Sequence, residues 1–124
     1  MRKRTVAGAL AASVTAAMLL GSASSASTAG EMKLLASASK GGVTAKLWLN
    51  TRTRVLHGEG LNLRKGEMVR MDRNYSIKGT WMAQSNVGSL NTTGFRGSGD
   101  FSVCAGSPVG GARFICTKYY DFNG

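Results

Sequence analysis

The two cysteines of the chain, Cys104 and Cys116, constrain its fold more than any other feature. They flank a Ser-Pro-Val-Gly-Gly stretch at 107–111, a composition typical of a tight turn. A turn centred on Gly110 places the two cysteines opposite each other on adjacent antiparallel strands. A non-hydrogen-bonded pair in such a ladder brings two side chains close enough for a disulfide bond. The sequence therefore predicts a disulfide-closed hairpin over residues 100–120.

The same register sorts the side chains of the hairpin onto two faces, because successive residues of a strand point in opposite directions. The cysteines point to one face, and the residues on either side of them point to the other. In this register Tyr119 lies opposite Phe101. We expect five side chains to form the core face of the hairpin, with the disulfide on the other face: Phe101, Val103, Ala105, Ile115 and Tyr119.

The first 29 residues have the pattern of an export signal, with basic residues at 2–4, an apolar run over 6–20 and small residues after it. We expect cleavage after Ala26, with Ala29 as the alternative end. The apolar run has about 15 residues, fewer than the roughly 20 that span a bilayer, so no membrane span is expected after cleavage. The sequence predicts a signal peptide over 1–26 and a single secreted, extracellular β domain over 27–124.

The chain is strongly basic, with 16 Lys and Arg against 6 Asp and Glu and a net charge of +10. Three of the basic residues belong to the predicted signal, which leaves 13 and a net charge of +7 after cleavage. These residues are dispersed along the chain. Their distribution is consistent with attraction to an anionic polymer, such as wall teichoic acid or nucleic acid, or to an acidic partner. It is equally consistent with solubility alone.

Alternating apolar and polar residues between turn-forming segments indicate short β-strands. In the clearest run, 43–50, Trp48 falls on the polar face. Four apolar residues share the other face of that run: Val43, Ala45, Leu47 and Leu49.

Further strands are predicted before and after this run, and turns separate them. The Gly-Glu-Gly tripeptide at 58–60 is interpreted as a turn, residues 84–99 as a long polar loop, and residues 121–124 as an end segment. Turn-forming segments about 8 to 12 residues apart favour an all-β fold, a small antiparallel sandwich or barrel closed by the C-terminal disulfide hairpin. The other strands are expected over 31–39, 51–57, 67–73, 77–83 and 87–90.

His57, the only histidine, and Glu59 are the candidates for catalysis. Secreted ribonucleases use a His, a Glu and arginines on a sheet to move protons and hold phosphate, and Arg52 and Arg54 lie close in sequence. The alternative is that His57 is a polar residue at the end of a strand. The chain has no Gly-x-Ser-x-Gly elbow of the kind that carries a serine nucleophile. We therefore expect no enzyme activity, with a ribonuclease that uses His57 and Glu59 as the alternative.

Four side chains are candidates for binding, because an aromatic ring among basic residues can stack on a sugar or a base. They are Trp48, Arg52, Arg54 and Arg70. The alternative for Trp48 is an aromatic side chain packed between strands. One histidine, two bridged cysteines and scattered carboxylates give no metal-ligand spacing, so we expect neither a metal nor a cofactor.

A family resemblance rests on four short motifs. They are Val-Arg-Met-Asp-Arg-Asn at 69–74, Gly-Thr-Trp at 79–81, Val-Cys at 103–104 and Ile-Cys-Thr at 115–117. Over residues 61–120 the chain resembles the small exported cystine-containing β-domains common in filamentous actinobacteria. Some of those domains accompany secreted carbohydrate-active enzymes, so the resemblance implies an accessory role and carries over no functional residue.

The leading interpretation is a secreted, non-catalytic, cationic binding domain that works as a monomer. Its expected partner is an anionic polymer or carbohydrate of the cell envelope, or an extracellular protein. The ribonuclease described above is one alternative. The other is an inhibitor of an extracellular protease that presents an exposed loop such as 84–99.

Overall fold

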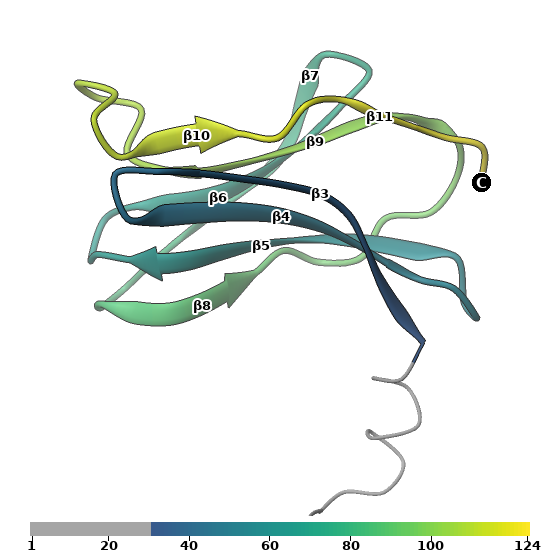
Figure 1. Ribbon diagram of the computed structural model, residues 1–124, viewed down its shortest axis with the longest axis horizontal. Helices are drawn as coiled ribbons and strands as arrows, with labels where there is room; N and C mark the ends of the chain where they lie inside the picture. Colours follow the sequence, from purple (N-terminus) through teal and green to yellow (C-terminus); the bar gives the residue numbers. More distant parts are fainter. Residues whose placement is uncertain (1–30) are drawn as a thin grey trace, which may run out of the picture. The chain divides into compact units, whose positions relative to one another are not determined.

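A computed structural model describes residues 31–124, and Lys33–Gly124 form one compact unit. The predicted signal peptide, with its cleavage site after Ala26 or Ala29, lies outside the described residues. Every regular element of the described range is a β-strand, which confirms the all-β class (Figure 1). No helix of residues 31–124 has the length and apolar character needed to cross a membrane.

The first sheet has four antiparallel strands in the order β3-β4-β5-β8. β4 and β5 pair over most of their length, and β8 extends the sheet on the far side of β5. The strands are β3 (Met32–Lys40), β4 (Val43–Asn50), β5 (Val55–Leu63) and β8 (Val87–Asn91).

The second sheet is built around β9 and has the order β10-β9-β6-β7, with β11 also paired to β9. β10 and β11 pair with successive parts of the same edge of β9, so they act as one edge strand with an interruption. The strands are β6 (Met68–Arg73), β7 (Ser76–Met82), β9 (Gly99–Gly106), β10 (Phe114–Cys116) and β11 (Tyr120–Phe122).

The two sheets pack face to face as a sandwich, and they do not close into a barrel. The alternation predicted for β4 is confirmed, because its four apolar residues are buried and Trp48 lies on the outer face. β6 contributes Val69 and Met71 to the same core. The most buried side chains from both sheets are Val43, Ala45, Leu47, Leu56, Leu63, Val69, Met71, Phe101, Val103 and Ala105.

The disulfide-closed hairpin is confirmed. β10 pairs with β9 in the predicted register, with Cys116 opposite Cys104, and the two sulfur atoms are bonded. The disulfide lies on the outer face, where Nη2 of Arg70 is 3.2 Å from the Cys104 sulfur. Four of the five predicted core side chains lie in or against the core: Phe101, Val103, Ala105 and Ile115.

The prediction for Tyr119 is wrong. β11 pairs with β9 one residue out of step with β10, so Tyr120 rather than Tyr119 lies opposite Phe101. The extra residue in the connection 117–119 reverses the direction of the side chains that follow it. Tyr120 therefore packs against the core, and Tyr119 stacks on Tyr75 with ring centroids 4.1 Å apart.

The turn predicted at 58–60 is also wrong, because these residues lie in the middle of β5. A Cβ atom on Gly58 would lie 2.8 Å from a methyl group of Val103, and one on Gly60 would lie 3.2 Å from the Cβ of Val69. The two glycines are therefore sites of close approach between the sheets, a role that glycine also has in strands.

Two further boundaries differ from the prediction. The strand expected at 51–57 begins at Val55, because Oδ1 of Asn50 accepts hydrogen bonds from the backbone N–H groups of Arg52 and Thr53 and turns the chain. The end segment expected over 121–124 contains the last two residues of β11, and Phe122 is buried in the core. Residues 51–54 thus form an exposed turn between β4 and β5.

Candidate functional site

The turn between β4 and β5 carries two of the predicted binding residues, Arg52 and Arg54, and both are exposed. The guanidinium carbon of Arg54 lies 4.9 Å from the centroid of the Phe122 ring, and its Nε donates at 3.3 Å to the main-chain oxygen of Gly124, the last residue of the sequence. The turn therefore lies against the end of β11 and the residues that follow that strand.

A third arginine, Arg96, reaches the same turn from the loop between β8 and β9. Its Nη1 donates to the carbonyl oxygen of Thr53 at 3.1 Å, between Arg52 and Arg54 in the chain. Two backbone hydrogen bonds between Leu56 and Phe95, of 2.8 and 2.7 Å, hold the loop beside the start of β5. Arg96 is exposed, as are the two arginines of the turn.

Arg73, the last residue of β6, reaches the same loop from the second sheet. Its Nη2 donates to the carbonyl oxygen of Ser98 at 2.6 Å, and its guanidinium carbon lies 5.1 Å from the ring centroid of Phe101. A Cβ atom on Gly124 would lie 3.8 Å from the nitrogen of Ser98, so the loop also meets the segment that Arg54 contacts. We call Arg52, Arg54, Arg73 and Arg96 the arginine end of the sandwich.

The groups that hold two of these arginines, Arg73 and Arg96, do not neutralise their charge. Both donate to backbone carbonyl oxygens, and neither bonds an Asp or Glu side chain within residues 31–124. A carbonyl group is a dipole and fixes the position of a guanidinium without cancelling its charge. Guanidinium groups bind phosphate, sulfate and carboxylate groups through paired N–H donors. The arginine end is therefore suited to an anion.

The structure does not bring Arg70 to the arginine end. Arg70 lies on the outer face of the second sheet, where its Nε and Nη2 donate to the two carboxylate oxygens of Asp72 at 2.8 and 3.0 Å. This two-point pair neutralises the guanidinium, which also lies 5.7 Å from the ring centroid of Phe114 beside the disulfide. Arg70 thus packs against the cystine.

Trp48 lies apart from the arginines, on the outer face of the first sheet. Its Nε1 donates to Oε1 of Glu59 at 2.8 Å, and Nζ of Lys46 lies 5.6 Å from the centroid of its ring. The indole is half-buried, and both its N–H group and its π-face already have partners. A sugar that stacked on this ring would have to displace Lys46 if it used the same face.

His57 and Glu59 also project from this outer face, because they are two residues apart on β5. Burial lowers the pKa of His57, although the charge of Glu59 and a hydrogen bond with the Asn91 side chain act in the opposite direction. The two oxygens of Glu59 accept bonds from Trp48 and Ser89. This face therefore carries an imidazole whose pKa is lowered, near a carboxylate that already has two donors.

Two residues of the arginine end, Arg73 and Arg96, were not singled out by the sequence analysis. Arg73 ends β6 directly before the turn at Asn74, and Arg96 lies in a Gly-Phe-Arg-Gly loop segment. Their position in or beside turn segments could have marked them as candidates for binding. The sequence does not show, however, which turns lie at the same end of the sandwich. Within the described residues, no group of three or more His, Cys, Asp or Glu side chains is placed to hold a metal ion.

Comparisons with known proteins return no match: no family model, no curated protein and no solved structure is similar to this chain.

Proposed function

We propose that this protein is a secreted, non-catalytic binding domain whose arginine end binds an anionic polymer outside the cell. The observation that carries the proposal is the arrangement of Arg52, Arg54, Arg73 and Arg96 around one loop, with Arg73 and Arg96 held by backbone carbonyls. The basic excess of the chain would attract a polyanion over a distance, and the four guanidinium groups would bind its acidic groups at short range.

The disulfide supports the extracellular part of the proposal, because such bonds form and persist mainly in oxidising compartments. The resemblance to exported cystine-containing domains is consistent with the same location. An anionic polymer of the cell envelope, rather than a neutral sugar, is the partner that fits arginines better than the covered indole of Trp48.

Heparin chromatography with a rising NaCl gradient tests this proposal, since heparin is a well-defined polyanion. We expect the double variant Arg54→Ser/Arg96→Ser to elute at clearly lower salt than wild type. The matched control is Lys65→Ser/Lys78→Ser, which removes the same charge from other parts of the surface. If both variants elute together, retention reports net charge alone and the proposal of a defined site is wrong.

A ribonuclease is the second candidate, and one observation favours it: β5 places His57 and Glu59 on the same face, just after the turn that carries Arg52 and Arg54. The test is cleavage of a fluorescent RNA oligonucleotide by wild type and by His57→Ala. Cleavage by wild type that is lost in the variant would support this function. Equal activity in both proteins, or none in either, would exclude it.

A further inference from the structure

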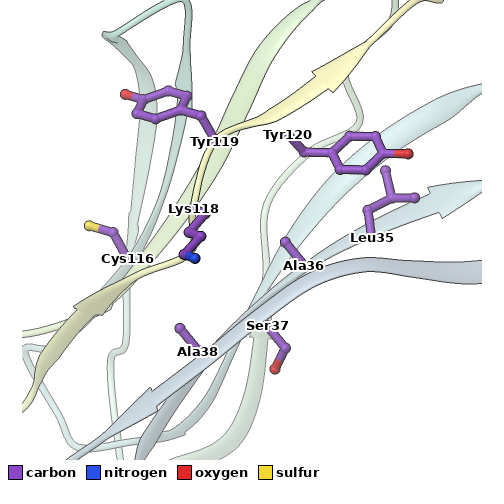
Figure 2. A pocket seen from close by; sticks show the side chains of 8 residues that line it. All are labelled: Leu35, Ala36, Ser37, Ala38, Cys116, Lys118, Tyr119 and Tyr120. Carbon is purple, nitrogen blue, oxygen red and sulfur yellow. The ribbon is translucent and has the colours of Figure 1, made fainter.

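A groove of about 460 Å³ lies between the two sheets on one side of the sandwich (Figure 2). One wall is the middle of β3, and the other is the connection from β10 to β11. Each wall is an edge strand of its own sheet. The lining residues are Leu35, Ala36, Ser37 and Ala38 on one side and Cys116, Lys118, Tyr119 and Tyr120 on the other.

The β3 wall presents unpaired backbone groups to the groove. β3 ends at Lys40 and β4 begins at Val43, so a two-residue turn of Gly41 and Gly42, both with positive φ, joins them. In such a hairpin Lys40 and Val43 exchange hydrogen bonds, and every second residue before Lys40 does the same with β4. Ser37 is one of the residues between, so its N–H and C=O groups point away from β4 and toward the groove.

The opposite wall has the same property. The N–H group of Thr117 donates to the carbonyl oxygen of Val103 on β9 at 2.8 Å. Because the ladder is antiparallel, the backbone groups of the adjacent residue, Cys116, point away from β9. The groove therefore lies between two strand edges that each have free backbone donors and acceptors.

The side chains of the groove are small on one wall and basic at its mouth. Figure 2 shows the methyl groups of Ala36 and Ala38 on the side of β3 that faces Lys118, whereas Ser37 points the other way. The ammonium group of Lys118 is exposed and has no carboxylate partner in the part of the chain that the structure describes. Tyr120 extends toward Leu35 and limits the groove at one end.

We propose that this groove binds an extended acidic peptide segment of a partner protein. The segment would add to the free edge of β3 as a further strand, and an Asp or Glu side chain on it would pair with Lys118. Main-chain hydrogen bonds to a sheet edge give affinity in this mode of recognition, and the side-chain positions give specificity. The small side chains of Ala36 and Ala38 leave room for the added backbone.

Charge decides against a second copy of this chain as the occupant. β3 has a lysine near each end, Lys33 and Lys40, so two β3 strands paired antiparallel around Ala36 would bring two lysines together at each end of the joined strands. Such like charges are unfavourable, and lysines on an edge strand oppose self-pairing of this kind. The same lysines, together with Lys118, attract an acidic segment.

The test begins with a displayed library of random nine-residue peptides selected on wild-type protein. We expect enrichment of peptides that combine β-branched residues with Asp or Glu. The most enriched peptide is then labelled and its affinity measured by fluorescence anisotropy. Ala38→Tyr fills the groove and should weaken binding by about tenfold or more, whereas Ser39→Tyr, on the opposite face of β3, should change it by less than about twofold.

Two further variants keep the proposal testable if Ala38→Tyr does not fold. Ser37→Pro removes the N–H donor that faces the groove without breaking a bond to β4, and it should also weaken binding. Lys118→Ser should weaken binding of the acidic peptide but not of the same peptide with Asn or Gln in place of its acidic residue. A double-mutant cycle with these four affinities measures the Lys118 pair directly.

Three outcomes would overturn the proposal. One is a selection that enriches no peptide, and another is binding that responds equally to the Ala38→Tyr and Ser39→Tyr changes. The third is a concentration-dependent dimer, seen by sedimentation, that the peptide dissociates, because a second copy would then be the occupant. Retention on heparin should be unchanged in Ala38→Tyr. Failure of the peptide experiment would therefore not affect the proposal for the arginine end, and failure of the heparin experiment would not affect the proposal for the groove.

Discussion

The two ends of the sandwich use arginine in opposite ways (Figure 1). At one end, four arginines gather around a loop, and two of them, Arg73 and Arg96, donate to backbone carbonyl oxygens. At the other end, Arg113 forms a two-point ion pair with Glu67, at 2.9 and 3.0 Å. Arg113 also donates to the carbonyl oxygens of Gly41 and Asn62, at 2.7 and 2.8 Å. We call Gly41, Asn62, Glu67 and Arg113 the clamp end.

The partner of an arginine, more than its exposure, separates a structural role from a binding role in this molecule. At the clamp end the carboxylate of Glu67 neutralises Arg113, and the hydrogen bond from Arg113 is the main reason that the pKa of Glu67 is lowered. That pair joins the β9–β10 loop to the segment before β6, so it holds the structure together. At the arginine end Arg73 and Arg96 bond no carboxylate side chain within residues 31–124, so an acidic ligand can supply to them what Glu67 supplies to Arg113.

The largest expected effect is on stability, at Gly106, which lies against Arg113 of the clamp end. Gly106 has a φ of 110°, and a Cβ atom there would lie 1.7 Å from the carbonyl oxygen of Arg113. Gly106→Ala should lower the free energy of unfolding by about 4 kcal/mol, roughly half from backbone strain and half from overpacking. The measurement is urea denaturation followed by tryptophan fluorescence.

Gly97→Ala is the matched control at the arginine end. Gly97 has a φ of 94°, but its Cβ atom would meet the end of the Arg73 side chain, at 2.8 Å, and not a backbone group. Since a flexible side chain can move, this variant should lose only about 1 to 2 kcal/mol. If Gly97→Ala lowered the free energy of unfolding as much as Gly106→Ala, the two ends would be equally rigid. The contrast between a rigid clamp end and an adaptable arginine end would then be wrong.

Removal of the disulfide should have the next largest effect. Cys104 and Cys116 are separated by 12 residues and close the hairpin that carries Arg113. Replacing both with Ala should reduce the free energy of unfolding by about 3 kcal/mol, because the unfolded chain is no longer restrained. Retention on heparin at a temperature where the variant is folded should match wild type. A shift in retention at that temperature would mean that the clamp end also shapes the binding site.

The ion pair of the clamp end should show itself in the pH dependence of stability. The pKa of Glu67 is lower in the folded state, so its contribution is present above the usual pKa of Glu and is lost as pH falls through the folded value. We expect Glu67→Gln to be less stable than wild type at pH 7, with the difference shrinking steadily in acid. A difference that is constant from pH 7 to pH 3 would show that the charge of Glu67 does not matter.

The smallest effect on stability is expected at the arginine end itself. Arg54→Ser/Arg96→Ser changes exposed side chains that bond only main-chain oxygens, of Gly124 and Thr53, and each substitution should alter the free energy of unfolding by no more than about 0.5 kcal/mol. The same double variant should elute from heparin at lower salt. Circular dichroism melts of the samples used for chromatography separate the two effects. A large loss of stability would indicate that these arginines, like Arg113, are structural.

The local part of the fold could be predicted from the sequence because it depends on neighbouring residues. Alternation over 43–50 gave the buried face of β4, and the turn around Gly110 gave the register of Cys104 and Cys116. The same reasoning failed at Tyr119, where one inserted residue reversed the side chains. It also failed at Gly58, whose role depends on Val103, a residue 45 positions away in the chain.

The candidate site was predicted only in part, for the same reason. Arg52 and Arg54 could be selected as a basic pair in one turn, but nothing local joins them to Arg73 or Arg96. Those residues come from a different sheet and a different loop, and Ser98 and Thr53 are the backbone groups that hold them. Arg70 was selected from the sequence for the same reason as Arg54, as a basic residue that could bind an anion, yet the structure pairs it with Asp72.

The strand pattern, the disulfide hairpin and the basic excess follow from periodicity, spacing and charge, so they could be predicted from the residues alone. Which arginines pair with a carboxylate side chain depends on the packing of two sheets, so it could be seen only in the folded molecule. The same stacking left the edge of β3 facing the edge of β10, and so created the groove. Neither edge is visible in a sequence, since a strand becomes an edge only when its neighbours have been placed.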